Sequence, residues 1–146
     1  MRASRQCDKR TQALEAASAG FRIFPVRQNS KAAAVKDWPN EATTDLQQVE
    51  SWWRTDPDYN IGIATGDGTI VLDVDTKNGK QGLESLALLD MLGLPDSYRV
   101  RTPSGGLHVY LTAAQAQRNR ANTIADYPGL DLRGDRGYVL GAGSTI

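Results

Sequence analysis

The sequence predicts an α+β fold, with helices packed on a mainly antiparallel sheet. Two patterns support this class: predicted strands follow one another as pairs joined by glycine-rich turns, and predicted helices lie between those pairs. The chain has 146 residues, of which 40% are hydrophobic, and this is enough for one domain with an ordinary core. We therefore expect a single domain over residues 1–146.

Helix signals are clearest where a capping residue precedes an apolar stripe. Thr44 and Gln47 form a capping box in front of Val49 and two tryptophans, and Asp8 or Thr11 can cap the first helix. Leucines recur at helical spacing before Gly93. The ranges predicted to be helical are 8–19, 44–55, 83–92 and 113–121.

Strand signals are short apolar runs separated by turn residues. Pro25 favours an edge position for the first strand, at residues 21–26, and residues 27–43 are expected to form a polar loop. Gly66 and Gly68 predict a tight hairpin turn. The predicted hairpins pair residues 60–65 with 69–75, residues 98–102 with 107–111, and residues 130–133 with 137–140.

Composition narrows the chemistry. A single cysteine excludes an internal disulfide and a cysteine-based zinc site, and a single histidine excludes paired-histidine metal sites. Seventeen basic residues balance seventeen acidic ones, but acids dominate residues 61–100 and arginines dominate residues 101–146. No apolar run approaches the roughly 20 residues of a membrane helix, so we expect a cytoplasmic protein without a membrane partner.

The run Ile70–Asp75 is the most informative motif. Residues two apart in a strand lie on one face, about 6.5–7 Å from each other, so Asp73 and Asp75 project together. Two carboxylates at this spacing can bind Mg²⁺ or Mn²⁺, which prefer oxygen ligands. The alternative is a solvated strand end that runs into a polar loop.

A second motif joins a glycine turn to a histidine. Gly105 and Gly106 follow Ser104 and allow the backbone to approach phosphate oxygens closely. His108 lies on the following strand, where it could donate a hydrogen bond to a nucleotide. The alternative is a plain hairpin turn followed by a half-buried strand.

A third motif places an acid between apolar residues. Asp131 is costly to bury without a metal, an arginine or water beside it, and as a third carboxylate it would complete a metal site. Arg133 has the planar guanidinium that suits phosphate binding. The alternative is that Asp131 pairs with Arg133 or Arg136.

These motifs, in this order, resemble those of the archaeo-eukaryotic primase superfamily, and most closely the bifunctional primase-polymerase N-terminal domain of phage, plasmid and bacterial replication proteins. The pattern is Asp-x-Asp at the end of a strand, then small-x-His, then a hydrophobic-Asp strand. The flanks agree from about residue 12 onward. They include Phe24-Pro25-Val26, Trp52-Trp53, Asn60–Gly66 and Arg133–Val139.

The resemblance implies a catalytic core related to the RNA-recognition-motif sheet, with an additional N-terminal α/β unit. It implies that Asp73, Asp75 and Asp131 hold the catalytic Mg²⁺ or Mn²⁺ ions, and that His108, Ser104 and the Gly105-Gly106 backbone contact the incoming nucleotide. Arg101, Lys36 and Arg133 are further candidates for triphosphate or template contacts. The implied partners are a DNA template and primer, nucleoside triphosphates and a helicase domain or protein.

The expected function is template-directed nucleotidyl transfer by a two-metal mechanism. The same acids could instead activate water in a phosphodiesterase or nuclease, or the chain could be a noncatalytic nucleic-acid-binding domain. Members of the family usually continue past the last predicted strand, whereas this sequence stops at Ile146, as expected of an excised fragment, a C-terminally truncated product or a minimal domain.

Overall fold

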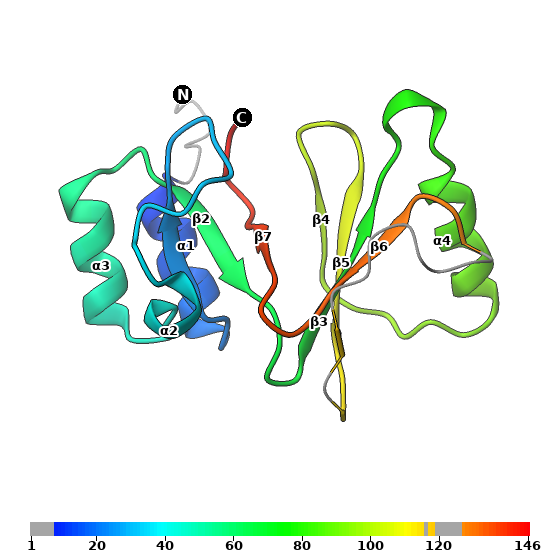
Figure 1. Cartoon of the computed structure of the whole chain (residues 1–146), viewed down its shortest axis with the longest axis horizontal. Coiled ribbons are helices and arrows are strands. Elements are labelled where there is room, and N and C mark those ends of the chain that lie inside the picture. Colours follow the sequence, from blue (N-terminus) through cyan, green and yellow to red (C-terminus); the bar gives the residue numbers. More distant parts are fainter. Residues whose placement is uncertain (1–7, 116, 119–126) are drawn as a thin grey trace, which may run out of the picture. The chain divides into compact units, whose positions relative to one another are not determined.

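The computed structural model describes residues 8–115, 117–118 and 127–146 and confirms the α+β class (Figure 1). The chain forms two compact units. In its described part, the first unit comprises residues 8–64 and 140–146, and the second comprises residues 65–139 without the gaps just named. None of the described helices is long and apolar enough to cross a membrane.

The first unit contains a sheet with the strand order β1-β2-β7 and helices beside it (Figure 1). Pro25 lies in β1 at the edge of this sheet, as predicted. The ring of Phe24 stacks on Trp38 and covers Gly62, where any side chain would collide with that ring. The elements are α1 (Lys9–Ser18), β1 (Ile23–Val26), α2 (Trp38–Glu41), α3 (Leu46–Thr55), β2 (Asn60–Ala64) and β7 (Tyr138–Leu140), of which Leu140 belongs to this unit.

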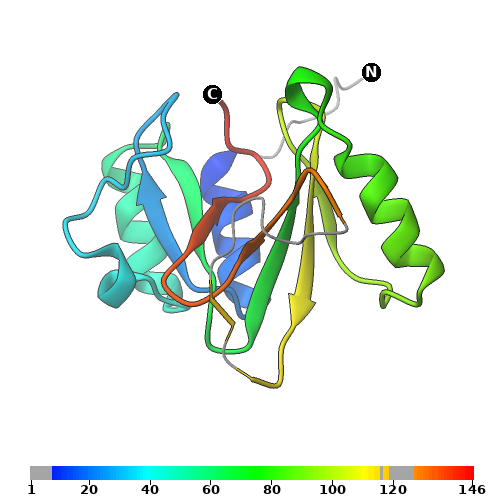
Figure 2. The same cartoon turned by 45° about the vertical axis from the view of Figure 1, so that its right-hand side comes forward.

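The second unit is built on an antiparallel sheet with the order β4-β5-β3-β6. Figure 2 shows β3 between β5 and β6, with α4 along one side of the sheet. The elements are β3 (Thr69–Val74), the short 3₁₀ helix η1 (Lys77–Gly79), α4 (Gly82–Met91), β4 (Arg99–Arg101), β5 (Leu107–Thr112) and β6 (Leu130–Arg133).

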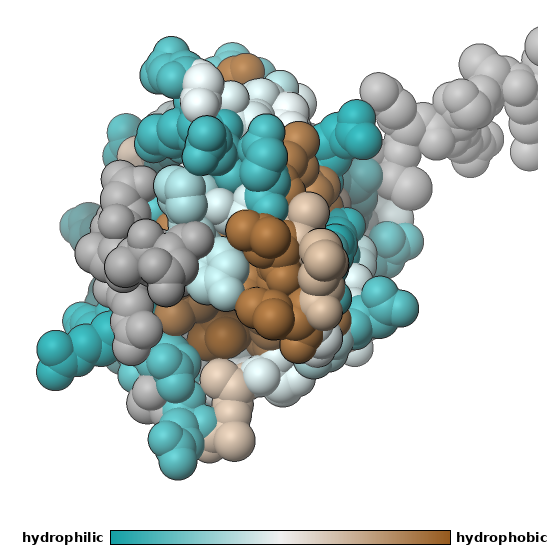
Figure 3. Space-filling model, turned by 90° about the vertical axis from the view of Figure 1, so that its right-hand side faces the viewer, coloured by the Kyte–Doolittle hydropathy of each residue, from teal (hydrophilic) through white to brown (hydrophobic). Residues whose placement is uncertain are grey.

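One face of this second sheet forms the core of the unit. Leu72 and Val74 of β3 pack with Val109 of β5, Leu130 of β6 and Leu86 of α4. Burial of these side chains fixes the register, because a slip of one residue would turn every apolar side chain of a strand to the other face. The outward side of α4 remains apolar and exposed, as the brown surface in Figure 3 shows. It carries Leu83, Leu88, Met91 and Leu92.

Two of the three predicted hairpins are wrong. The turn at Gly66–Gly68 forms, but β2 and β3 belong to different sheets, and so do β6 and β7. A tight turn specifies only a local reversal of the chain, and it does not determine which strand the next segment joins. The third hairpin, β4 with β5, is confirmed.

The helix predictions are confirmed for α1, α3 and α4, with one corrected cap. Asp45, not Thr44, caps α3, since its carboxylate accepts a hydrogen bond from the Gln47 N–H at 3.0 Å. The predicted loop 27–43 contains the short helix α2. Residues 113–115 and 117–118 are not helical, and the rest of the range predicted as a fourth helix lies outside the described residues.

Candidate active site

Three predicted site residues form a row across the second sheet. Asp73 of β3 is directly paired with His108 on one side and with Asp131 on the other. Directly paired residues of antiparallel strands share a face, with Cβ atoms about 4.5–5.5 Å apart. The strand register therefore brings together side chains that are 58 residues apart along the chain, counted from Asp73 to Asp131.

This row lies on the face opposite the apolar core. The neighbours of Asp73 in its strand, Leu72 and Val74, belong to the core cluster with α4, and side chains alternate along a strand. The expected geometry, with Asp131 on the same side of the sheet as Asp73, is thus what the register gives.

Asp73 is held between His108 and Arg133. Its Oδ1 lies 3.5 Å from Nε2 of His108, and its Oδ2 lies 3.8 Å from the Arg133 guanidinium. The same guanidinium lies 3.9 Å from Oδ2 of Asp131. Arg133 therefore offsets part of the charge of two neighbouring carboxylates, at distances longer than a hydrogen bond.

The surroundings keep Asp73 ionised. Burial by itself would raise the pKa of this carboxyl, but the hydrogen bond and charge of His108, together with Arg133, lower the pKa below its ordinary value. The nearby Asp75 acts in the opposite direction. A carboxylate that stays ionised at neutral pH can bind a cation.

His108 has one engaged and one open nitrogen. Its ring is buried, and among the described residues Nδ1 has no hydrogen-bond partner. A buried polar atom without a partner costs about 1–3 kcal/mol, so this nitrogen is suited to a ligand. If Nε2–H is directed at Asp73, Nδ1 accepts a hydrogen bond in the neutral ring and donates one only when the ring is protonated.

Asp75 follows β3 directly, and its carboxylate is occupied by the next loop. Oδ1 accepts a hydrogen bond from the Lys77 N–H at 2.9 Å, and Oδ2 forms an ion pair with Lys80 Nζ at 3.1 Å. The Lys77 N–H is the main cause of the lowered pKa of Asp75, with Lys80 contributing. Asp75 thus lies two residues beyond Asp73, but its carboxylate forms an ion pair with Lys80.

Glycines allow the chain to pack tightly around the end of β3. The Asp75 N–H donates to the Gly129 carbonyl at 2.8 Å, and the Gly82 N–H donates to the Asp75 carbonyl at 3.1 Å. A side chain at Gly82 or Gly129 would collide with this backbone, and one at Gly106 would collide with the Val74 carbonyl. These close approaches fix the position of the Asp75 backbone at the end of β3.

The Thr102–Gly106 loop is closed by its own hydrogen bonds. The Gly105 N–H donates to the Thr102 carbonyl at 3.0 Å, and the Gly106 N–H donates to the Thr102 hydroxyl at 3.1 Å. Ser104 Oγ lies 3.2 Å from that same hydroxyl. The two glycine N–H groups expected to cradle phosphate are therefore already used within the loop, and the structure does not support that part of the prediction.

Two further predicted basic residues are not part of the row. Arg101 is directly paired with Leu107, which is itself paired with Val74, so its side chain begins on the core face of the sheet. Lys36 is exposed in the turn before α2 and belongs to the first unit. Of the predicted arginines, only Arg133 contacts the aspartates.

The acidic residues suit a hard divalent cation in kind and in place. Asp73 and Asp131 offer carboxylate oxygens from adjacent strands, which is the ligand type that Mg²⁺ and Mn²⁺ prefer. Nevertheless, no three acidic, histidine or cysteine side chains of the described residues are grouped closely enough to hold a metal ion. The third predicted metal ligand, Asp75, has its carboxylate paired with Lys80.

Sequence reasoning missed Lys80, Gly82 and Gly129. Lys80 lies five residues beyond Asp75 in a polar loop, and this spacing is not a signal for an ion pair. Gly82 and Gly129 give a weak signal of close backbone packing, because neither belongs to a predicted hairpin turn that would account for a glycine. Their role depends on contacts between segments far apart in sequence.

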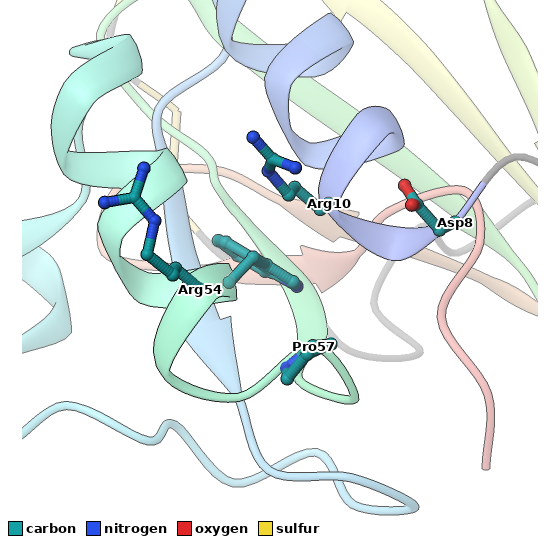
Figure 4. Close-up of a pocket in the computed structure, with 5 residues that line it drawn as sticks. Asp8, Arg10, Arg54 and Pro57 are labelled. Atoms are coloured by element: carbon teal, nitrogen blue, oxygen red, sulfur yellow. The ribbon is translucent and has the colours of Figure 1, made fainter.

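A pocket in the first unit is lined by Asp8, Arg10, Trp53, Arg54 and Pro57 (Figure 4). Arg10 of α1 and Arg54 of α3 both bind Glu50, so one carboxylate offsets two guanidinium groups. The pocket contains none of the predicted site residues.

Comparison with known proteins identifies the chain at the level of its family. A search of curated protein sequences finds no match. A family model, by contrast, covers nearly the whole sequence, including every residue of the row across the second sheet. Residues 13–146 match the family described as bifunctional DNA primase/polymerase, N-terminal, and the chain belongs to this family of primase- and polymerase-type domains.

Proposed function

We propose that this chain catalyses template-directed nucleotidyl transfer, with Asp73 and Asp131 at the reacting centre. The supporting observation is the row His108–Asp73–Asp131 on the face of the second sheet opposite its apolar core. It combines two paired carboxylates, a buried imidazole with an open nitrogen and one guanidinium. Such a set suits the transfer of a phosphoryl group between oxygens, which depends on positioning and electrostatics.

In this proposal Asp73 and Asp131 would hold Mg²⁺ or Mn²⁺, and Asp75 would complete a two-metal site. The cations, when bound, would favour ionisation of the attacking 3′-hydroxyl and offset charge on the leaving pyrophosphate. The chain itself contributes the fixed spacing of the carboxylates, which the strand register sets before any substrate arrives.

His108 would position the incoming nucleotide. With Nε2 beside Asp73, its open Nδ1 is suited to accept a hydrogen bond from a sugar hydroxyl or, when the ring is protonated, to donate one to a phosphate oxygen. Both contacts would anchor the nucleotide next to the carboxylates. Ser104, in the loop before β5, would add a hydroxyl contact.

Arg133 would offset part of the negative charge of Asp73 and Asp131 and then pair with the triphosphate. Its contacts to Asp73 and Asp131, at 3.8 and 3.9 Å, are long, so little is lost when the guanidinium turns toward a phosphate. A guanidinium binds phosphate oxygens through two parallel N–H groups, which fixes orientation as well as charge.

The wider setting proposed for the chain is replication of a phage, a plasmid or a related element, with a DNA template and primer, nucleoside triphosphates and a helicase as partners. This setting rests on family membership alone. We keep Arg101 and Lys36 as candidates for template contacts outside the row.

A primer-extension assay with Mg²⁺ or Mn²⁺ tests the proposal. The parental chain should lengthen a labelled primer on a template, and Asp73→Ala should remove this activity while the circular dichroism spectrum stays unchanged. Extension by Asp73→Ala at the parental rate would exclude Asp73 from the mechanism. Shortened primers would instead indicate the phosphodiesterase reaction, and unchanged primers without metal-dependent nucleotide binding would indicate a noncatalytic domain.

A further inference from the structure

Asp75 differs from the other two aspartates in the partner that holds it. Asp73 and Asp131 share the Arg133 guanidinium at 3.8 and 3.9 Å, whereas Asp75 has a direct ion pair with Lys80 at 3.1 Å. Its second oxygen accepts the Lys77 N–H at 2.9 Å. Both oxygens of this carboxylate are therefore already engaged.

Of these two contacts, only the one with Lys80 is easily broken. The Lys77 N–H belongs to the backbone of η1, directly after the strand, and is fixed by the fold. Lys80 reaches Asp75 through a flexible side chain that is 42% exposed. An exposed ion pair of this kind changes an equilibrium by about fivefold at most, so solvent can replace it.

We propose that Lys80 acts as a built-in competitor for the divalent cation at Asp75: its ammonium group occupies the carboxylate until a cation displaces it. The proposal rests on the function proposed above, in which Asp75 is a metal ligand. Lys80 is then a positioning residue, because it acts on the cation only through Asp75.

The competition follows from charge and geometry. A cation that binds Asp75 next to Lys80 meets a positive charge about 3 Å from the oxygen that it needs, so the lysine must swing away first. The work of separating this pair lowers the apparent affinity of the site. It also explains how three nearby carboxylates are tolerated without a metal, since each has a cationic or backbone donor beside it.

The loop offers a matched control. Lys77 and Lys80 carry the same charge and flank the same 3₁₀ turn, and both are exposed. Of the two lysines, Lys80 forms the ion pair with Asp75, at 3.1 Å, while Lys77 contributes its backbone N–H, which survives any side-chain change. Comparing the two separates the specific contact from the general effect of removing a positive charge.

The test measures Mn²⁺ binding directly, by electron paramagnetic resonance of free Mn²⁺ during titration of the full chain without nucleotide. Lys80→Met should bind Mn²⁺ about two- to fivefold more tightly than the parental chain. Lys80→Arg should bind like the parental chain, because a guanidinium can still pair with Asp75. Lys77→Met should change the affinity by less than about twofold.

Asp75→Asn separates failure of this inference from failure of the proposed function. If Asp75 is a metal ligand, Asp75→Asn weakens Mn²⁺ binding, and adding Lys80→Met to it has no further effect. If Asp75→Asn weakens binding but Lys80→Met alone does not tighten it, the competition is refuted and the proposed function stands. If Asp75→Asn leaves binding unchanged, Asp75 is no ligand and both statements about it are wrong.

Discussion

The two faces of the second sheet separate stability from chemistry. On one face Leu72, Val74 and Leu130 are buried with α4, while on the other Asp73, His108 and Asp131 form a polar row. Leu72 and Asp73 are neighbours in one strand, yet they face opposite surroundings. A change on the apolar face should therefore lower stability and spare the site, and a change in the row should do the opposite.

The largest effect is expected at Asp73. Asp73→Asn keeps the shape of the side chain but removes the charge, so nucleotide incorporation should fall by about 10³-fold or more, as for loss of a group that stabilises the transition state. Single-nucleotide extension kinetics measure this. Asp96→Asn, an exposed change of the same charge in the same unit, is the control and should retain parental rates.

The row should also behave as one unit. Asp131→Asn should lower the rate nearly as far as Asp73→Asn, and the double variant should be little worse than either, because residues that serve one site are not additive. Multiplied losses in the double variant would show that the two carboxylates act independently.

On the apolar face, Leu130→Ala should destabilise the fold by about 2–5 kcal/mol, because the side chain is fully buried in the core cluster and its removal leaves a cavity. Urea denaturation followed by far-UV circular dichroism measures the free energy of unfolding. Met91→Ala, on the exposed side of α4, should change it by less than about 0.5 kcal/mol. Equal losses for the two variants would contradict the assignment of the faces.

Gly106 packs against the end of β3, and Gly106→Ala should lower the free energy of unfolding by about 1–3 kcal/mol. The new methyl group would collide with the Val74 carbonyl, which is backbone and can move only if the strand moves. Ser104→Ala, in the same loop but exposed, should be nearly neutral in the same denaturation experiment. A neutral Gly106→Ala would show that the loop does not press on the end of β3.

The smallest effect is a dependence of stability on pH. The folded pKa of Asp73 is lowered, mainly by His108 and Arg133 acting against burial, so its stabilising contribution is present above the unfolded pKa of about 3.9 and is lost as the pH falls through the folded value. The difference in unfolding free energy between the parental chain and Asp73→Asn should be constant near neutral pH and shrink below about pH 4. If this difference in unfolding free energy grew on acidification, the folded pKa of Asp73 would be raised rather than lowered.

Features of the fold that depend on residues close together in the sequence could be predicted, and features that depend on contacts between distant segments could not. Strand positions, the alternation of Leu72 and Asp73 and the helix caps are local, and most of them were predictable, although Asp45 rather than Thr44 caps α3. Sheet membership is not local. The turn at Gly66–Gly68 favours a hairpin, yet the strands on either side of it join different sheets.

The same distinction holds in the site. That Asp73 and Asp131 lie side by side follows from the pairing of β3 with β6, which no local pattern near Asp131 specifies and which only the order of the motifs suggested. The ion pair of Lys80 with Asp75 depends on the path of the loop at η1. The side chain of Arg101 begins on the core face of the sheet because Arg101 is paired with Leu107. Neither can be obtained from spacing alone.

The central claim is that the paired carboxylates of Asp73 and Asp131 form one cation site. It is tested most directly by calorimetric titration of Mn²⁺ into the parental chain, Asp131→Asn and the control Asp96→Asn. We expect Asp131→Asn to weaken binding by at least about tenfold and Asp96→Asn to leave it unchanged. Parental affinity in Asp131→Asn would contradict the account.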